Sequence, residues 1–279
     1  MKKAFALLLS AVMVMGTLVG CGGSETTETK ASETTAAETT AEVTENGDKW
    51  IIATDTVFRP FEYTDENGDF VGIDVDILAA IAEDQGFDYE LQSLGWDAAV
   101  LAVQTGQADA IIAGATIKQE RIDSGWIFSD GYYDATQTFV VAAGSDIASF
   151  EDLEGKNVAV KNATAGADFA NSLKDQYGFT VTVFEDSPTM YQDVLLGNSA
   201  ACVEDTPIMA SNIKDSGIEL MIPEGMESEG APYGFAIMDT ADQELLDMFN
   251  AGLANIKANG TYDEILAKYL VNNLEEFYE

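Results

Sequence analysis

The chain has 279 residues, with 13 Lys and Arg against 49 Asp and Glu, which gives a formal net charge of −36 at pH 7. So acidic a protein repels nucleic acid and anionic lipid, and we expect no nucleic-acid partner. It contains no histidine, which removes the commonest general base, the Ser–His and Cys–His nucleophile pairs and most zinc sites. An enzyme of this composition would have to work with carboxylates and lysines alone.

Residues 1–20 are typical of a bacterial signal peptide. A basic start precedes an apolar run at 4–19 that is too short and too interrupted to be a convincing membrane span. The tetrapeptide Leu-Val-Gly-Cys at 18–21 resembles the lipobox of bacterial lipoproteins, in which the peptide is cut before the cysteine and the sulfur is acylated. The alternatives are an ordinary secretory signal or an uncleaved anchor. We expect Cys21 to attach the protein to the outer face of the cell membrane.

A tether is predicted to follow, with the lipidated cysteine and the low-complexity stretch together covering 21–48. It consists mainly of Thr, Glu, Ala and Ser and has no aromatic residue, so it cannot bury enough apolar surface to fold. As a flexible coil of about 25 residues it would reach on the order of 30 Å. Once Cys21 is lipidated, only Cys202 remains, so no intrachain disulfide can form, and Cys202 is interpreted as a small core residue.

From Trp50 the chain alternates between strand and helix patterns. The first half predicts, in order, a strand at 50–54, a hairpin with strands at 61–63 and 70–71 around Asn67-Gly68, a helix with an apolar stripe at 77–82 that ends at Gly86, a strand at 87–91, a helix that ends at Gly106, and a strand at 110–113.

The pattern restarts after about Tyr133. Strands are predicted at 139–141, 158–160, 181–184, 201–203 and 233–237, and a long helix at 245–257. Ser187 is predicted to be the N-cap of a helix with Pro188 in its first turn, and the sequence at 261–264 predicts a capping box for the last helix. Strands interleaved with helices predict an α/β fold with mostly parallel sheets covered on both faces.

Polar residues follow several of these strands at the point where each strand ends. They are Asp55, the stretch Gly114-Ala115-Thr116, Lys161, and Glu204 with Asp205. Ligands of parallel α/β sheets bind beyond the carboxyl ends of the strands. We therefore expect these residues, which come from both halves of the chain, to face one cleft.

Arg121 lies a few residues beyond Thr116 and is one of only two arginines, the other being Arg59. Its guanidinium fork could bind a carboxylate with two parallel hydrogen bonds. Alternatively, Arg121 could form a structural ion pair with Glu120 or Asp123. The residues alone leave both interpretations open.

Other candidates have both a ligand-binding and a structural interpretation. Thr164-Ala165-Gly166 begins a predicted helix, whose free N–H groups could bind a carboxylate. Asp205 suits an ammonium group, although it could equally be a helix N-cap ahead of Pro207. Phe58 and Trp96 are each predicted to lie in a loop after a strand; aromatic side chains are usually core, but this position favours a cleft wall for Trp96.

Six motifs occur in a fixed order along the chain, at 55–63, 72–77, 114–121, 128–133, 155–161 and 259–263. In this order they resemble the extracellular solute-binding proteins (family 3) of polar amino-acid ABC importers, over essentially all of 49–269. Among members, the chain looks closest to glutamine-binding proteins. The resemblance implies a two-lobed periplasmic-binding-protein type II fold, with lobe 1 at 49–131 and 234–279, lobe 2 at 137–229, and hinge strands at 132–136 and 229–233.

The resemblance also implies a role for each candidate. Arg121, with the backbone amides of Thr116 and the Thr164-Ala165 turn, would bind the α-carboxylate of an amino acid. The α-ammonium would be bound by Asp205, the Gly114 carbonyl and the Thr116 hydroxyl. At the other end, Asp55 and Lys161 would bind a side-chain amide, and Phe58 and Trp96 would enclose the aliphatic part.

Two departures from the family pattern concern specificity. Glutamine binders have a histidine where this chain has Glu204, and the turn after Lys161 has Ala163 and Ala165 instead of glycines. Glu204 could favour a basic amino acid, whereas Lys161 opposes one by like-charge repulsion. Cystine is a third alternative.

We therefore expect a lipid-anchored, monomeric receptor that closes its lobes over a free polar L-amino acid, foremost glutamine, and delivers it to an ABC permease. It would need no metal or cofactor and have no catalytic residue. An enzyme on the same fold is a separate alternative, for example a dehydratase with Glu204 or Asp205 as general acid.

Overall fold

The computed structural model describes residues 49–270. The predicted signal peptide, Cys21, the tether and residues 271–279 lie outside the described part. Within 49–270, none of the helices combines the length and the apolar character that a membrane crossing requires.

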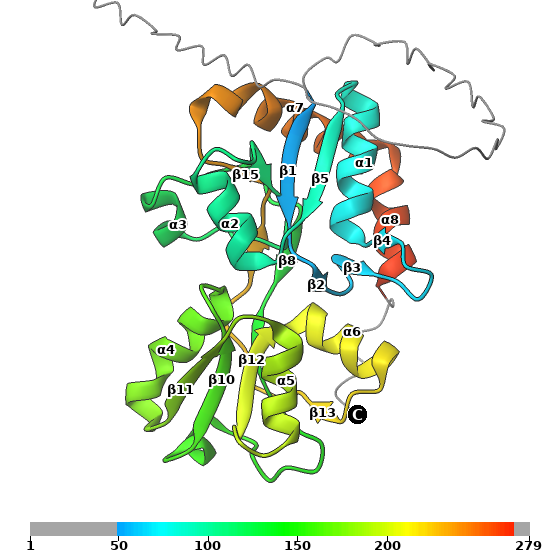
Figure 1. Cartoon of the computed structure of the whole chain (residues 1–279). Coiled ribbons are helices and arrows are strands. Elements are labelled where there is room, and N and C mark those ends of the chain that lie inside the picture. Colours follow the sequence, from blue (N-terminus) through cyan, green and yellow to red (C-terminus); the bar gives the residue numbers. More distant parts are fainter. Residues whose placement is uncertain (1–48, 271–279) are drawn as a thin grey trace, which may run out of the picture. The chain divides into compact units, whose positions relative to one another are not determined.

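The described chain alternates between strands and helices, as its sequence pattern predicts (Figure 1). The strands are β1 (Trp50–Thr54), β2 (Val57–Phe58), β3 (Glu62–Thr64), β4 (Phe70–Val71), β5 (Tyr89–Ser93), β6 (Ala110–Ile111), β7 (Ile127–Phe128), β8 (Tyr133–Ala135), β9 (Gln137–Ala142), β10 (Asn157–Lys161), β11 (Thr180–Phe184), β12 (Ala201–Asp205), β13 (Leu220–Met221), β14 (Ala231–Tyr233) and β15 (Ala236–Ile237). The helices are α1 (Ile73–Gln85), α2 (Trp96–Gln104), α3 (Gln119–Asp123), α4 (Ala165–Tyr177), α5 (Ser187–Leu195), α6 (Thr206–Ser216), α7 (Gln243–Asn259) and α8 (Thr261–Tyr269), with short 3₁₀ turns η1 (Phe150–Leu153) and η2 (Thr240–Asp242).

Two five-stranded sheets share one pattern of strand order. The first runs β5-β1-β6-β15-β7 and the second β11-β10-β12-β9-β13. In each, three neighbouring strands are parallel, namely β5, β1 and β6, and β11, β10 and β12. The next strand, β15 or β9, runs antiparallel to them. The predicted two-lobed α/β fold is confirmed, with sheets that are mixed rather than wholly parallel.

The chain passes between the two sheets twice. It leaves the first sheet after β7 through β8, and it returns from β13 through β14 to β15. β8 and β14 pair with each other as a two-stranded antiparallel ribbon. Within residues 49–270, the chain therefore starts on the first sheet, forms the second sheet between β8 and β14, and then returns to the first.

Both sheets are covered by helices on their two faces, because successive strand residues point to opposite sides. In β1, Ile52 packs in a core with α1, α7 and α8, whereas Ala53 packs in a core with α2. In β10, Val158 and Val160 face α4, whereas Ala159 faces α5 and α6. Four separate apolar clusters result, and these hold the strand ends in fixed positions.

Three local predictions are wrong. Asp186, not Ser187, is the N-cap of α5, and its carboxylate accepts a 2.8 Å hydrogen bond from the N–H of Thr189. α8 has no capping box, because the left-handed Gly260 both ends α7 and begins α8. The strand predicted at 233–237 is broken between β14 and β15 at Gly234, where a Cβ would come within 2.9 Å of the side chains of Ile117 and Phe128.

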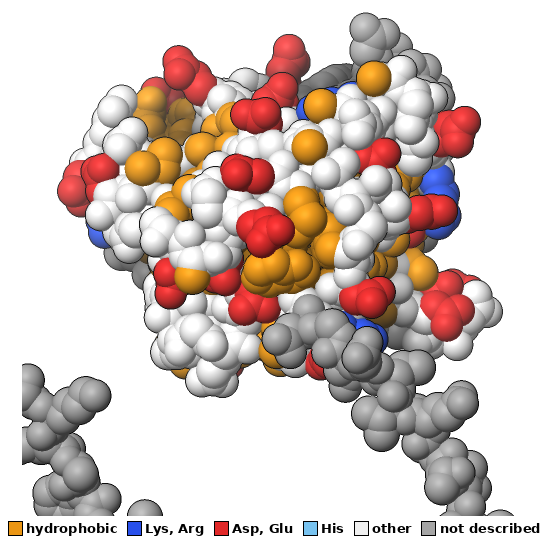
Figure 2. All heavy atoms as spheres, turned by 90° about the horizontal axis from the view of Figure 1, so that it is seen from above, with side chains coloured by type: hydrophobic (Ala, Val, Ile, Leu, Met, Phe, Trp, Pro, Cys, Tyr) orange, Lys and Arg blue, Asp and Glu red, His pale blue; other side chains and the backbone are white. Residues whose placement is uncertain are grey.

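The face in Figure 2 carries many Asp and Glu side chains and few Lys or Arg, with apolar side chains between them. This distribution agrees with the strongly negative formal charge of the sequence. Like charges spread over a surface keep a protein soluble and oppose association with polyanions.

Candidate functional site

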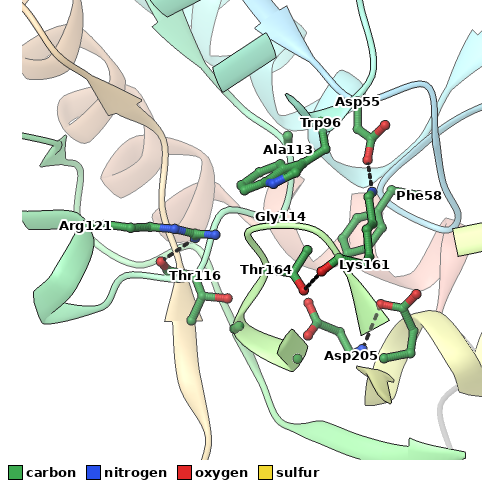
Figure 3. Close-up of a pocket in the computed structure, with 13 residues that line it drawn as sticks. Asp55, Phe58, Trp96, Ala113, Gly114, Thr116, Arg121, Lys161, Thr164 and Asp205 are labelled. Carbon is green, nitrogen blue, oxygen red and sulfur yellow. Dashed lines mark hydrogen bonds and ion pairs between the residues drawn. The ribbon is translucent and has the colours of Figure 1, made fainter. Parts of the chain in front are cut away.

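A pocket lies where the carboxyl ends of strands from both sheets meet (Figure 3). Its atom-free space is about 350 Å³, part of which is open to solvent. All the ligand-binding residues predicted individually line it, namely Asp55, Phe58, Trp96, Gly114, Thr116, Arg121, Lys161, Thr164, Ala165, Glu204 and Asp205. Gly166, predicted as part of the helix start at 164–166, also lines it, and so does Ala113, which was not predicted.

At one end of the pocket, Lys161 forms an ion pair with Asp55. Lys161 is the last residue of β10 and Asp55 follows β1, so the pair joins the two sheets. The side chains are only 5% and 7% exposed, and the Lys161 Nζ lies 5.4 Å from the centre of the Phe58 ring. Burial alone would lower the pKa of Lys161, but the neighbouring Asp55 carboxylate outweighs it and the pKa is raised.

At the other end, Arg121 in α3 is held among aromatic rings and carbonyl oxygens. Its guanidinium carbon lies 4.9 Å from the Trp96 ring centre and 5.3 Å from that of Trp126. Nη1 donates to the Thr116 carbonyl at 2.8 Å, and Nη2 donates across to the Ala163 carbonyl at 3.3 Å. Burial lowers the pKa of Arg121 to about 10, a value at which the group keeps its charge at neutral pH.

The alternative interpretation of Arg121 as half of a structural ion pair is wrong. Within 49–270, the ion pairs are Lys118–Asp168, Lys161–Asp55 and Lys268–Asp76. Neither Glu120 nor Asp123 pairs with Arg121, because α3 directs Arg121 inward while these two carboxylates stay exposed. A buried cation that has carbonyl partners but no carboxylate is suited to an anionic ligand.

Asp205 faces the pocket from the end of β12. It occupies the N-cap position of α6, yet its side chain makes no cap hydrogen bond. Oδ1 instead accepts from Gln137 Nε2 at 2.9 Å, and Oδ2 accepts from the hydroxyl of Tyr233. Burial, and then the nearby charge of Glu204, raise the pKa of Asp205 to about 6. The N-cap alternative is thus right about position and wrong about what the carboxylate does.

Glu204 is directed to the α5 side of β12. Its Oε2 accepts from Ser187 Oγ at 2.7 Å and from the Tyr191 hydroxyl at 2.6 Å, and its Oε1 accepts from the N–H of Asp205 at 2.9 Å. Burial, followed by the charge of Glu204, raises the pKa of Tyr191 well above its usual range. Glu204 therefore contributes negative charge beside the pocket while its oxygens are engaged by the protein.

The start of α4 forms part of the pocket wall. Thr164 is its N-cap and accepts a 3.2 Å hydrogen bond from the N–H of Ala167. The N–H groups of the first helical turn have no partner within a helix, so those of Ala165 and Gly166 are available to a carboxylate. Ala163 before them has φ 54°, a left-handed conformation that a glycine would adopt without strain.

Phe58 and Trp96 are wrongly predicted to lie in loops. Phe58 ends the short strand β2, and Trp96 is the first residue of α2. Both are buried and belong to apolar clusters as well as to the pocket lining. The Phe58 ring lies so close to Gly114, which has φ 54°, that a Cβ at 114 would meet it at 2.5 Å.

Several residues that orient the pocket groups were not predicted: Trp126 on Arg121, Gln137 and Tyr233 on Asp205, and Ser187 and Tyr191 on Glu204. For Gln137 the missing information is strand pairing, since β9 lies antiparallel to β12 with Gln137 opposite Asp205. No sequence pattern indicates this register. Across residues 49–270, no cluster of three or more His, Cys, Asp or Glu side chains is arranged to hold a metal ion.

Comparison with known proteins places this site in a family. Residues 50–272 match the bacterial extracellular solute-binding proteins, family 3. The chain belongs to this family, which agrees with the resemblance carried by the six sequence motifs.

Individual relatives span nearly the full chain but differ in the ligand they are named for. The arginine-binding extracellular protein ArtP of Bacillus subtilis is 29% identical over 96% of this chain and 98% of its own. The glutamine-binding protein GlnH of an ABC transporter of Bacillus subtilis is also 29% identical, over 97% and 98%. A crystallised ancestral arginine-binding protein bound to glutamine is 33% identical over 80% of this chain and 97% of its own, with a TM-score of 0.72.

Proposed function

We propose that this protein is an extracellular receptor that encloses a free L-amino acid in the pocket and passes it to an ABC permease. The observation that carries the proposal is the buried Arg121 guanidinium, which has two indole rings and two carbonyls around it and no carboxylate partner within 49–270. Asp205 on the other sheet is a buried carboxylate that still has free lone pairs. A zwitterion complements both charges at once.

We propose glutamine as the preferred ligand. Lys161 and Asp55 present a donor and an acceptor side by side at the far end of the pocket. A primary amide matches both, because its oxygen accepts from Lys161 and its nitrogen donates to Asp55. Arginine and lysine would instead bring a cation against Lys161, and the Glu204 oxygens that could compensate already accept hydrogen bonds from Ser187, Tyr191 and the backbone.

Isothermal titration calorimetry of the full chain against the twenty amino acids, ornithine and cystine tests both statements. We expect glutamine to bind most tightly and arginine and lysine to bind at least about tenfold more weakly. Tighter binding of a basic amino acid or of cystine would overturn the choice of ligand. No binding tighter than about 1 mM for any compound would overturn the receptor function itself.

Enclosure requires the two lobes to move, and we propose 132–136 and 229–233, which contain β8 and β14, as hinges. The described structure has direct contacts between the lobes near the pocket: Lys161 with Asp55, Arg121 with the Ala163 carbonyl, and Asn162 Nδ2 with Asp97 at 3.0 Å. These contacts support a closed arrangement of the lobes in the proposed mechanism. Because the ligand charges would touch both lobes, ligand binding stabilises closure. Small-angle scattering with and without glutamine should show a smaller radius of gyration when glutamine is bound.

We further propose that the mature protein is a monomer held at the membrane by a lipid on Cys21. The lipobox-like tetrapeptide at 18–21 supports this attachment. Replacement by Cys21→Ser should release the protein from the membrane fraction while leaving glutamine binding unchanged. A variant that stays in the membrane fraction would argue for a different anchor.

A further inference from the structure

Glu62 and Asp74 form a pair of carboxyl groups beside the pocket that the proposed ligand contacts do not use. Glu62 begins β3, Asp74 lies in the first turn of α1, and both are 0% exposed. Asp74 Oδ2 accepts from the N–H of Gly114 and from the hydroxyl of Tyr132, both at 2.9 Å. The other three oxygens, Glu62 Oε1 and Oε2 and Asp74 Oδ1, have no donor among the described residues.

A single proton accounts for this arrangement. The N–H of Asp74 donates to the Phe61 carbonyl at 2.9 Å, so the neighbouring Glu62 lies beside Asp74. Two such buried carboxylates cannot both be ionised without a large cost, whereas one protonated carboxyl supplies the missing donor. Burial, and then the charges of Asp74 and Asp55, raise the pKa of Glu62 well above its usual range. Burial also raises the pKa of Asp74, and the hydrogen bonds from the Gly114 N–H and the Tyr132 hydroxyl limit that rise to about 6. These opposing influences favour Glu62 over Asp74 as the group that carries the proton.

The groups that face this pair come from several elements. Asp55 after β1 acts on Glu62 with negative charge and Lys161 at the end of β10 acts with positive charge. The Tyr132 hydroxyl reaches Asp74 from just before β8. An ionised Glu62 would be a second carboxylate near Lys161, competing with Asp55 for its charge.

We propose that Glu62 and Asp74 share one proton, carried by Glu62, and that the pair positions the pocket. Ionised Asp74 fixes the backbone at Gly114 and the hydroxyl of Tyr132, which joins the pocket to the β8 segment. Neutral Glu62 satisfies Asp74 Oδ1 and leaves Lys161 paired with Asp55. Glu62 is thus a positioning residue for both ends of the site.

Infrared spectroscopy of the ligand-free protein tests the proton without any ligand. The wild type at pH 8, where Asp74 and Asp205 are ionised, should show the carbonyl stretch of a buried protonated carboxylic acid, and Glu62→Gln should lose it. Glu66→Gln, which changes an exposed carboxylate in the β3–β4 turn, is the matched control and should keep it. A wild-type spectrum without this band, or a band that survives Glu62→Gln, overturns the proposal.

Binding affinity tests the positioning role, and this readout alone rests on the proposed function. Glu62→Gln retains an N–H donor for Asp74, so we expect its glutamine affinity to stay within about twofold of wild type. Glu62→Met has similar length but no donor, and we expect a loss of about tenfold or more. Equal affinities for the two variants would overturn the role. If Glu62→Met does not fold, a loss of glutamine affinity of more than tenfold in folded Glu62→Gln would overturn the positioning role. If the wild type binds no amino acid, the infrared result still decides whether the proton is there.

Discussion

Lys161 and Asp55 join the two sheets through one ion pair whose side chains are 5% and 7% exposed. A second lysine–aspartate pair, Lys118 with Asp168, also connects the two lobes, but its side chains are 19% and 59% exposed. The two pairs have the same chemistry in different surroundings. Solvent screens the second pair, whereas the first is desolvated and faces the pocket.

Lys161→Met should weaken glutamine binding by at least about tenfold, because it removes a hydrogen-bond donor and leaves Asp55 buried without its cation. It should also reduce the discrimination against arginine, because the like charge is gone. Calorimetry with both amino acids measures the two effects. Lys118→Met is the control: we expect it to change stability by less than about 1 kcal/mol and to leave the glutamine-to-arginine ratio unchanged. An unchanged ratio in Lys161→Met would show that Lys161 does not select the side chain.

Arg121→Lys keeps the positive charge but loses the planar fork and its contact with the neighbouring rings of Trp96 and Trp126. We expect a loss of about 1.5–3 kcal/mol of binding free energy, or roughly 10- to 150-fold in affinity. Arg59→Lys is the matched control, since Arg59 also lies over an aromatic ring, that of Tyr63, at 3.8 Å. Wild-type affinity in Arg121→Lys would contradict a bidentate contact with the ligand.

Glutamine binding should weaken in mild acid because of Asp205, whose pKa is raised to about 6 by burial. A bound ammonium favours the ionised carboxylate, so the ligand lowers this pKa. The affinity for glutamine should therefore reach its full value well above pH 6, where Asp205 is ionised. Below pH 6 it should fall by up to about tenfold per pH unit. The stability of the ligand-free protein depends on pH in the opposite direction. Because the pKa of Asp205 is higher in the folded than in the unfolded chain, its protonation contributes stability that is lost as pH rises from about 4 to 6.

Calorimetry between pH 4.5 and 8 measures this dependence, and proton release on binding should be largest midway between about pH 6 and the lower pKa of Asp205 in the complex. Asp74 also has a pKa of about 6, so Asp205→Asn is the necessary control. We expect this variant to bind weakly with a flat pH profile. A slope that persists in Asp205→Asn would assign the effect to Asp74.

Ala163→Val should destabilise the protein by more than about 1 kcal/mol, because a β-branched residue is strongly disfavoured at the φ of 54° found there. It should also lower affinity, since the Ala163 carbonyl is a partner of Arg121. Ala163→Gly should change stability by less than about 1 kcal/mol, because relief of strain is offset by the entropy of the unfolded chain. Urea unfolding of both variants measures the difference; equal stabilities would show that the turn is unstrained.

The sequence predicts the pocket well where a general rule of sheet geometry applies. Asp55, Lys161 and Asp205 are separated widely in the chain, yet they meet because each lies at or just after the carboxyl end of a parallel strand. The period-2 and helical patterns also find most of the strands and helices. The lobe boundaries stay predictions because they are defined by a relative motion of the lobes. The ligand contacts stay predictions because they require a bound amino acid.

The errors occur where local patterns compete with tertiary contacts. Ser187 looks like an N-cap, but Asp186 fills that role and the Ser187 hydroxyl donates to Glu204. Trp96 follows a glycine and resembles a loop residue, but it is the first residue of α2 and its ring packs in the apolar cluster that contains Ala53. The Glu62–Asp74 pair could not be recognised either, since the two carboxyls meet only after β3 packs near α1.

The affinities of the wild-type protein for glutamine and for two analogues test the central claim most directly. Glutaminamide lacks the α-carboxylate that Arg121 would bind, and glutaramic acid lacks the α-ammonium that Asp205 would bind. We predict that each analogue binds at least about 100-fold more weakly than glutamine, because each leaves one buried charge of the protein without its partner. Binding of either analogue as tightly as glutamine would contradict the account.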